Sequence, residues 1–315
     1  MENIWDVPAG GKKSGFLKVA GCGHELPVTV IRGREGGKTA LVTAGVHSAE
    51  YVGIQAAMEL AAELAPEDVH GTVVIAPLIN VSGFTRRTMS MVYEDNKNLN
   101  REFPGAACGT VAEQICHTVA TKLIARADYY IDLHSGDGYE DLHPYAYYVG
   151  PVDPAVREQA LQMARRVRVP YLVESQGTTG GAYNYANAIG VPAVLIERGG
   201  LGVWSRAEVD LDKGDVRRIL AYLGVLEGPP EEPLEEQTVF KDAVYENAPE
   251  HGCWYPALRP GDRFEKGDVL GEIRDYFGKS LYTCVAKADG RILFQTVSLT
   301  VLKGGPMVAY GVLPH

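Results

Sequence analysis

Polar residues of types that bind metals follow three separate apolar segments of this chain. His47 and Glu50 come after the run TALVTAGV, His134 ends the run DYYIDLH, and Glu197 ends VPAVLIE. Two imidazoles and one carboxylate form the ligand set of a catalytic zinc site whose fourth position stays open for water. With the first three residues in that role, Glu197 remains free to accept a proton from zinc-bound water and pass it to the leaving group.

Each of these signals is weak when taken alone. An acidic residue near a helix start is favoured there by the helix dipole, and a lone histidine before a turn is commonly structural. Glu197 could equally form an ion pair with its neighbour Arg198. The three segments are independent, however, and each supplies a residue suited to the same zinc site. Together they support the hypothesis of a zinc site. Asp132, two residues before His134, adds a carboxylate able to orient a ligand imidazole.

The segments that carry these residues are predicted to be strands of one sheet. Apolar runs alternate with amphipathic stretches from residue 38 to about residue 225, a pattern typical of strands covered by helices on both faces. The sequence therefore predicts an α/β domain with a mixed, mainly parallel sheet flanked by helices. Ligands of such sheets bind at the carboxyl ends of the strands, which places the three polar ends together. The predicted strands are KTALVTAG, GTVVIAPLIN, DYYIDLH, PYLVES and VPAVLIERG; the predicted helices are EYVGIQAAMELAAEL, GTVAEQICHTVATKLIARA, PAVREQALQMARRV and AEVDLDKGDVRRILAYLGVL.

A change of pattern divides the chain. Residues 1–226 form the predicted catalytic domain, and residues 227–237 form an acidic, proline-rich linker. Residues 238–315 have no helical period and consist of short strand-like segments between glycine turns, which predicts a small β-barrel or sandwich. We expect this domain to pack over the catalytic mouth and to limit substrate size, with the loop around Asp275 and Tyr276 nearest the site.

The composition is that of an ordinary globular chain with an acidic balance. The 315 residues are 46% hydrophobic and 22% charged, with a formal net charge of −10, which argues against a nucleic-acid partner. No window approaches a membrane span, and the N-terminal stretch lacks the apolar core of a signal peptide. The five scattered cysteines fit a reducing compartment, so we expect a cytoplasmic protein.

The loop DNKNLNREFPG adds a potential substrate-binding pair. Asn100 and Arg101 offer an amide and a bidentate guanidinium, which together suit a carboxylate. The alternative is an asparagine-rich turn with a solvated arginine.

The motifs GVHSAEY, NLNREFPG, DLHSG and PAVLIERGG, in this order, resemble the zinc carboxypeptidase superfamily, most closely its succinylglutamate desuccinylase/aspartoacylase family. The resemblance covers nearly the whole chain, since this family also has a C-terminal β domain. It implies one zinc ion per chain, with His47, Glu50 and His134 as its ligands and Glu197 as the general base and acid. The implied reaction is hydrolysis of the amide bond of an N-acyl amino acid or a related small molecule, with zinc-bound water as the nucleophile.

The resemblance also implies substrate contacts. Asn100 and Arg101 match the pair that binds the substrate carboxylate. The family usually has a further arginine about ten residues earlier that stabilises the oxyanion, but position 90 is serine here. Arg87 or its neighbour Arg86 fills that role in our interpretation, the alternative being a solvated basic pair.

A tyrosine in the glycine-rich segment GTTGGAYNYANAIG is a further candidate. Tyr183 resembles the mobile, substrate-facing tyrosine of the family, and Tyr185 is the rival candidate. We expect this segment to be a loop that precedes the strand of Glu197.

Two other functions stay open at this point. A metallocarboxypeptidase acting on short peptides would need an open cleft, against which the small β domain argues. A non-catalytic metal-binding or carrier-type module, suggested by Lys287 in VAKADGRI, would not need Glu197. The expected partner is a small-molecule N-acyl amino acid, with homo-oligomerisation left open.

Overall fold

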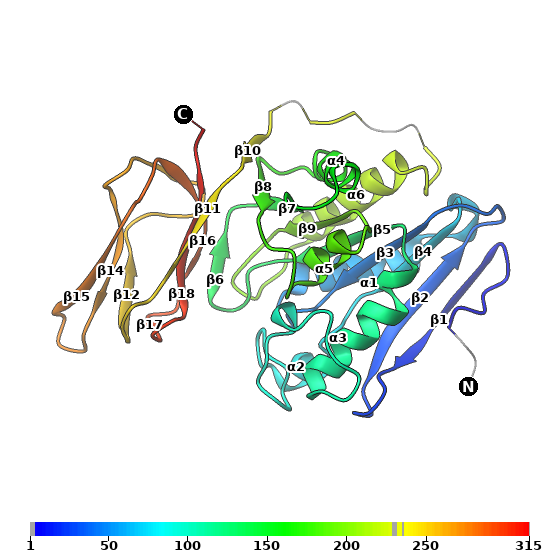
Figure 1. The fold of residues 1–315 in the computed structure, drawn as a ribbon, viewed down its shortest axis with the longest axis horizontal. Helices are drawn as coiled ribbons and strands as arrows, with labels where there is room; N and C mark the ends of the chain where they lie inside the picture. The colour runs from blue at the N-terminus through cyan, green and yellow to red at the C-terminus, as the bar shows by residue number, and fades with distance from the viewer. Residues whose placement is uncertain (1–3, 229–231, 235, 315) are drawn as a thin grey trace.

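The chain folds around a nine-stranded mixed sheet with the strand order β1-β2-β4-β3-β5-β9-β7-β8-β10 (Figure 1). The computed structural model describes residues 4–228, 232–234 and 236–314, so residues 229–231 and 235 of the predicted linker lie outside the described residues. The strands of this sheet are β1 (Gly11–Lys18), β2 (Glu25–Arg32), β3 (Thr39–Ala44), β4 (Thr72–Ala76), β5 (Tyr129–His134), β7 (Tyr145–Val149), β8 (Tyr171–Ser175), β9 (Ala193–Glu197) and β10 (Thr238–Phe240).

Helices cover both faces of the sheet, as the apolar runs predict. The helices are α1 (Tyr51–Glu63), α2 (Val81–Arg86), α3 (Val111–Lys122), α4 (Pro154–Ala164), α5 (Ala182–Ala188) and α6 (Arg206–Tyr222), with the 3-10 turns η1 (Pro66–Asp68), η2 (Leu99–Arg101) and η3 (Ile124–Arg126). Successive residues of one strand point to opposite faces. Leu41 of β3 accordingly packs in the core with α3 and α5, while Val42 packs in the core with α1, α4 and α6. The predicted α/β domain is confirmed.

The N-terminal edge of the sheet lies outside the predicted pattern. β1 and β2 form an antiparallel hairpin, and β2 then pairs antiparallel with β4. β7, which was also not predicted, pairs antiparallel with β9 and parallel with β8. The centre of the sheet, β4-β3-β5-β9, is one continuous parallel run, and β7-β8-β10 is a second.

The C-terminal part is all-β, as predicted. One antiparallel sheet has the order β11-β18-β16-β13, and a second has the order β15-β14-β12-β17. The strands are β11 (Ala243–Asn247), β12 (Gly252–Pro256), β13 (Arg263–Phe264), β14 (Val269–Arg274), β15 (Ser280–Val285), β16 (Gly290–Thr296), β17 (Thr300–Val301) and β18 (Pro306–Val312). Trp254, Ile273, Met307 and Tyr310 belong to a single buried cluster drawn from both sheets.

Two strands tie the two parts together. β10 follows the linker in sequence but pairs parallel with β8 of the large sheet. β6 (Glu140–Leu142) precedes the linker but pairs antiparallel with β16 of the C-terminal sheet. The pairing of strands therefore does not separate into two parts at the linker. β6, which comes shortly after His134 in the sequence, pairs directly with the C-terminal part.

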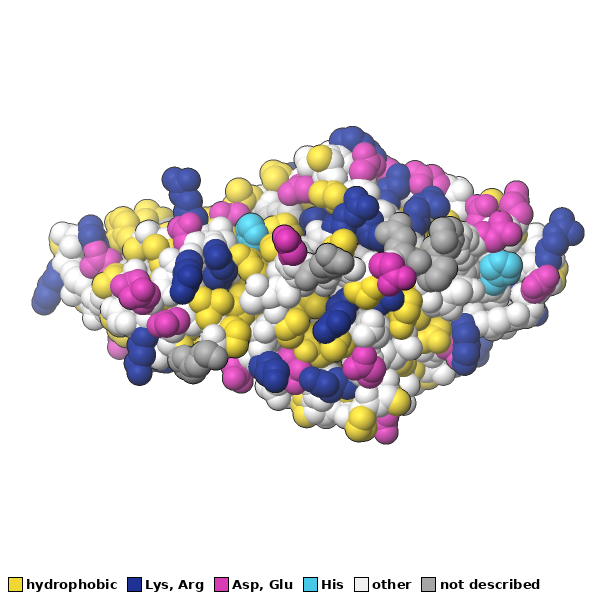
Figure 2. Space-filling model, turned by 90° about the horizontal axis from the view of Figure 1, so that it is seen from above, with side chains coloured by type: hydrophobic (Ala, Val, Ile, Leu, Met, Phe, Trp, Pro, Cys, Tyr) yellow, Lys and Arg dark blue, Asp and Glu magenta, His cyan; other side chains and the backbone are white. Residues whose placement is uncertain are grey.

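The surface mixes charges of both signs. On the face shown in Figure 2, Lys and Arg side chains are interspersed with Asp and Glu. Among the described residues, we find no helix long and apolar enough to cross a membrane.

Candidate metal centre and active site

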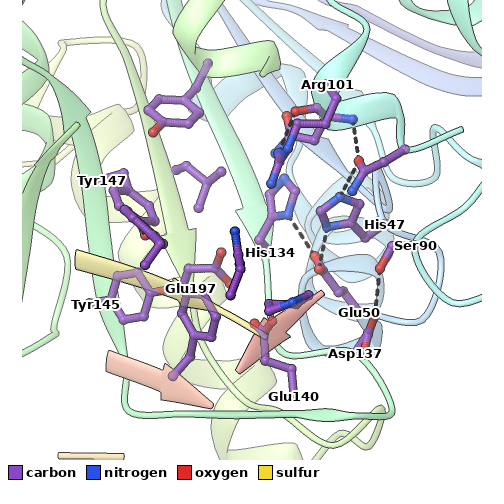
Figure 3. Close-up of a pocket in the computed structure, with 18 of the residues that line it drawn as sticks. His47, Glu50, Ser90, Arg101, His134, Asp137, Glu140, Tyr145, Tyr147 and Glu197 are labelled. Atoms are coloured by element: carbon purple, nitrogen blue, oxygen red, sulfur yellow. Dashed lines mark hydrogen bonds and ion pairs between the residues drawn. The ribbon is translucent and has the colours of Figure 1, made fainter. Parts of the chain in front are cut away.

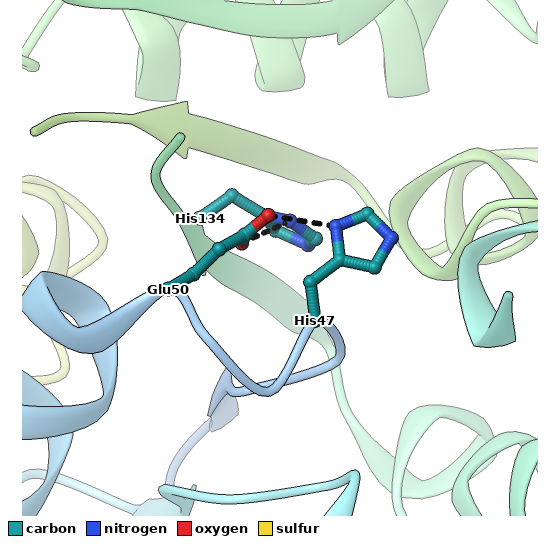
Figure 4. Close-up of side chains that lie close together, drawn as sticks. All are labelled: His47, Glu50 and His134. Atoms are coloured by element: carbon teal, nitrogen blue, oxygen red, sulfur yellow. Dashed lines mark hydrogen bonds and ion pairs between the residues drawn. The ribbon is translucent and has the colours of Figure 1, made fainter. Parts of the chain in front are cut away.

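The polar ends of three segments meet because β3, β5 and β9 are neighbouring parallel strands. His134, the last residue of β5, is in register with Glu197, the last residue of β9. His47 and Glu50 lie in the turn between β3 and α1. Figure 4 shows His47, Glu50 and His134 pointing toward one another.

Two glycines allow this close approach. Gly45 begins the turn after β3 with a φ of +66°, and a Cβ there would lie 2.8 Å from a side-chain carbon of Leu78. Gly53 in α1 packs against β5 so closely that a Cβ would lie 2.7 Å from the Cβ of Leu133. The positive φ at Gly45 and the close approach at Gly53 are both conditions that favour glycine. They allow Glu50, the residue before α1, to lie beside the end of β5.

The Glu50 carboxylate lies between two imidazoles. Its Oε1 is 2.7 Å from His47 Nδ1, and its Oε2 is 2.8 Å from His134 Nδ1. The backbone N–H of Ser135 also donates to Oε2 at 3.2 Å. Burial raises the pKa of Glu50, but both imidazoles outweigh that effect and the pKa falls to about 2. The three residues offer donor atoms that all lie within 4.8 Å of one another.

The remaining nitrogen of each imidazole has its own oxygen partner. His47 Nε2 lies 2.9 Å from Asn98 Oδ1, and His134 Nε2 lies 3.2 Å from Asp132 Oδ2. Thr43 Oγ1 donates to the other oxygen of Asp132 at 2.6 Å. A tautomer with the proton on Nε2 donates to these oxygens and leaves each Nδ1 lone pair for a metal. The donor set therefore fits a divalent metal such as zinc.

Glu197 stands beside this cluster with an unsatisfied oxygen. Its Oε2 is fully buried and has no hydrogen-bond partner among the described residues. Burial, and then the negative charge of Glu50, raise the pKa of Glu197 to about 8. A buried carboxylate oxygen without a donor is unusual and indicates a site where a ligand supplies the partner.

Arg198 does not form an ion pair with Glu197. The interpretation of Glu197 as a structural ion-pair partner of Arg198 is therefore wrong. The Arg198 guanidinium, 3% exposed, donates to Asp212 at 3.0 Å and to Asp215 at 2.5 Å. Both carboxylates lie on α6 and are completely buried. Arg198 thus attaches the end of β9 to α6 and leaves the neighbouring Glu197 free.

Replacing Arg198 by Met should destabilise the fold, because it leaves Asp212 and Asp215 with less compensation for their buried charge. We expect the free energy of unfolding to fall by about 3–5 kcal/mol, measured by urea titration. Arg206→Met is the matched control: Arg206 pairs with Glu59 but is 54% exposed, so a loss of about 0–1 kcal/mol is expected. Equal losses in the two variants would contradict the structural role of Arg198.

The cluster opens into a pocket of about 670 Å³ (Figure 3). The C-terminal part contributes a large share of its wall through β11, β16, β18 and nearby turns: Tyr245, Glu246, Asn247, Phe294, Pro306 and Val308. The expectation that the loop around Asp275 lies nearest the site is wrong. That loop is a β14–β15 turn absent from the pocket wall, and its Tyr276 is 85% exposed.

The Asn-Arg pair also borders this pocket. Asn100 and Arg101 lie in η2, and both line the pocket. Asn100 is buried, and its Oδ1 accepts from the backbone N–H of Ala182 at 3.0 Å. Arg101 is exposed at the mouth, where its Nη1 donates to the Asn100 carbonyl at 2.8 Å.

Residues 36–223 match the catalytic domain of succinylglutamate desuccinylase/aspartoacylase. The chain belongs to this family. It is 31% identical to the N-alpha-acetyl-L-2,4-diaminobutyric acid deacetylase of Halomonas elongata, over 86% of this chain and 82% of that protein. The family makes the chain a deacylase, an enzyme that hydrolyses amide bonds of N-acyl amino acids, which favours the enzyme over the non-catalytic alternatives.

Solved structures of the family share the whole fold. The product-bound ectoine utilization protein EutE (DoeB) of Ruegeria pomeroyi superimposes with a TM-score of 0.86 at 28% identity, covering 97% of each chain. A succinylglutamate desuccinylase of Silicibacter sp. TM1040 gives a TM-score of 0.85 at 25% identity, covering 99% of this chain and 97% of that one. The C-terminal β part is thus shared as well as the catalytic sheet.

The two arginines suggested for oxyanion stabilisation in this deacylase lie away from the pocket wall. Arg86 and Arg87 are exposed at the end of α2, and neither lines the pocket. Arg86 instead stacks over the ring of Tyr93 at 5.0 Å. Ser90 does line the pocket, and its hydroxyl donates to Asp137 Oδ2 at 2.7 Å.

The candidate tyrosine of the deacylase is on a helix, which corrects the loop expectation. Tyr183 lies in the first turn of α5, is buried, lines the pocket and stacks on Tyr147 with ring centroids 6.1 Å apart. Tyr185 is not among the described lining residues.

Several pocket residues of the deacylase were not predicted from the sequence. Asn98, the partner of His47, lies in the same NLNREFPG segment as the predicted pair, so its amide could have been considered. Tyr147 and Tyr245, whose hydroxyls are 2.8 Å apart, come from the two parts of the chain. Glu140 on β6 carried no signal, because neither its strand nor its pairing with β16 was predicted.

Proposed function

We propose that this deacylase binds one zinc ion through His47, Glu50 and His134 and hydrolyses the amide bond of an N-acyl amino acid. The observation that carries the proposal is the meeting of these donors with an unpartnered, buried Glu197 oxygen. The supporting hydrogen bonds of Asp132 and Asn98 orient the imidazoles without occupying Nδ1. Such orienting partners are typical of functional zinc sites.

The reaction adds water to the carbonyl carbon and breaks the C–N bond, releasing an acid and an amine. Bound zinc supplies Lewis-acid polarisation of the carbonyl and lowers the pKa of water in the open position. Glu197 accepts the water proton on its free carboxylate oxygen and returns it to the leaving nitrogen. A pKa raised toward neutral by burial suits a group that must both take and give a proton.

The remaining pocket residues bind and enclose the substrate. Arg101 and Asn100 hold the substrate carboxylate, for which a guanidinium and an amide are suited. Tyr245 and neighbouring residues of the C-terminal part close the far wall, which supports a small substrate over a peptide. The Halomonas relative is named for an N-acetylated amino acid, so N-acetyl amino acids are the class to test first.

Metal analysis together with activity tests this proposal. We expect about one zinc per chain, loss of hydrolysis after chelation, and recovery on zinc addition. Release of acetate from N-acetyl amino acids should exceed cleavage of dipeptides with free N-termini. The proposal fails if zinc-loaded enzyme hydrolyses neither class, or if chelation leaves the rate unchanged.

A further inference from the structure

Five aromatic rings form a continuous wall on one side of the pocket. Tyr147 of β7 packs edge-to-face on Tyr145, with ring centroids 5.1 Å apart, and stacks on Tyr183 at 6.1 Å. The ring of Tyr245 on β11 lies 6.3 Å from that of Phe294 on β16. The hydroxyls of Tyr147 and Tyr245 are 2.8 Å apart and join the two groups of rings. All five residues line the pocket, and together they are the aromatic wall.

The aromatic wall offers ordered ring surface to a ligand. Tyr245 is 51% exposed, yet its hydroxyl bonds to that of the buried Tyr147, which holds the exposed ring in place. Rigid rings of this kind bind apolar groups, and other rings in particular, in stacked or edge-to-face arrangements. The wall is therefore suited to a neutral, flat part of a substrate.

The wall lies beyond the reacting centre from Arg101. Glu197 is in register with His134 on one neighbouring strand and with Tyr145 on the other. Residues directly opposite on neighbouring strands point to the same face, so Glu197 stands between His134 and Tyr145. Figure 3 shows Arg101 on the side of the candidate ligands and Tyr145 on the opposite side of Glu197. A substrate whose carboxylate meets Arg101, and whose amide lies beside Glu197, would place its acyl group against the wall.

The described part of the pocket wall has no second lysine or arginine that could bind a carboxylate on the acyl group. Arg101 is the one such residue, and it binds the carboxylate of the amino acid in the proposed reaction. Away from the candidate ligands, the charged residues of the wall are acidic, among them Asp137 and Glu140. An acyl group that ends in a carboxylate, such as succinyl, would lose hydration there without gaining a partner.

The pocket is larger than an N-acetyl amino acid requires. Its volume of about 670 Å³ falls within the range of about 300–1,000 Å³ typical of pockets for drug-sized ligands. An acetyl group ends one methyl beyond the carbonyl and would leave most of the aromatic wall without a contact.

We propose that the aromatic wall is the acyl subsite, and that the deacylase prefers neutral, ring-bearing acyl groups such as phenylacetyl over both acetyl and succinyl. This inference rests on the proposed deacylase reaction and adds to it the class of acyl group. Burial and stacking of the acyl ring stabilise the bound substrate. Hydrolysis adds one water across the amide bond and releases phenylacetate and the free amino acid.

A panel of N-acyl amino acids tests the inference, with each amino acid carrying an acetyl, a phenylacetyl or a succinyl group in turn. We expect zinc-loaded wild type to favour phenylacetyl over acetyl by about 10- to 100-fold in kcat/KM, the range for burying one ring. The succinyl compounds should give a lower kcat/KM than the acetyl compounds of the same amino acid.

One pair of isomers shows on which side of the amide the ring binds. Phenylacetylglycine and N-acetylphenylglycine have the same composition, but the first carries its ring on the acyl group and the second on the α-carbon. We expect kcat/KM to be higher for phenylacetylglycine by about tenfold or more. Equal values, or a preference for N-acetylphenylglycine, would assign the wall to the amino-acid side chain and overturn the inference.

Tyr245→Ala removes the exposed ring of the wall and should lower the phenylacetyl-to-acetyl ratio of kcat/KM by about 3- to 10-fold. Tyr255→Ala is the matched control: Tyr255 lies on β12, is 41% exposed and is not on the pocket wall, so the ratio should stay at the wild-type value. Tyr245→Lys places a cation in the wall and should raise the succinyl-to-acetyl ratio. If Tyr245→Ala does not fold, Tyr245→Leu replaces it with the same expected direction.

The outcomes distinguish the two proposals. Wild type that hydrolyses acetyl or succinyl compounds as well as phenylacetyl compounds overturns the acyl subsite and leaves the deacylase reaction standing. An unchanged phenylacetyl-to-acetyl ratio in Tyr245→Ala also overturns it, because a ring that binds the acyl group acts selectively. No hydrolysis of any compound of the panel by zinc-loaded wild type refutes both proposals.

Discussion

Replacing Glu197 by Gln is expected to reduce kcat by about 10²- to 10⁴-fold, the range for loss of a general acid–base group. Glutamine keeps the size of the side chain and its place at the end of β9, but it cannot exchange a proton with water or the leaving amine. The zinc content should stay at the wild-type level, because His47, Glu50 and His134 are unchanged. Steady-state kinetics and metal analysis of one preparation measure both quantities.

The control for Glu197→Gln is Glu272→Gln, the same chemical change on β14 away from the pocket wall. It should leave kcat and zinc content unaltered. Loss of zinc in Glu197→Gln would make Glu197 a ligand instead of a proton carrier. Near-normal turnover with zinc retained would remove it from the mechanism.

Replacing Glu50 by Gln should abolish both metal binding and activity. Glu50 supplies the negative charge between the two imidazoles, through Oε1 toward His47 and Oε2 toward His134. Glutamine keeps the shape but not the charge that offsets a divalent ion. Loss of the metal removes several kcal/mol of transition-state stabilisation, which corresponds to a fall in kcat/KM of about 10³-fold or more. Titration against a chelator of known affinity measures the metal.

Asp132→Asn provides the graded comparison for Glu50→Gln. Asp132 reaches the cluster only through His134 Nε2, at 3.2 Å, so it should orient the imidazole without holding the metal. We expect metal affinity to fall by about 10- to 100-fold, with activity restored by excess zinc. A loss as complete as that of Glu50→Gln would contradict this role and indicate that Asp132 is itself a ligand.

The centre of the sheet and the strands that carry the candidate ligands could be predicted from the sequence. Apolar runs such as those ending at His134 and Glu197 are local patterns, and buried parallel strands produce them directly. The strands β1 and β2 at one edge, and β7 between β9 and β8, were not predicted. β1 alternates between half-buried and exposed residues, so its sequence, GKKSGFLK, lacks the apolar run that marked the central strands.

What the sequence by itself determined is the set of candidate site residues at the strand ends, because apolar runs mark the strands locally and ligands of parallel sheets bind at the carboxyl ends of the strands. The tertiary structure alone decided which neighbours act on them. Arg198 forms an ion pair with α6 and not with Glu197. Arg86 and Arg87 lie at the end of α2, away from the pocket wall. β6 pairs with β16, which places Glu140 in the pocket. These outcomes depend on contacts between segments distant along the chain, and such packing leaves no period or spacing in the sequence.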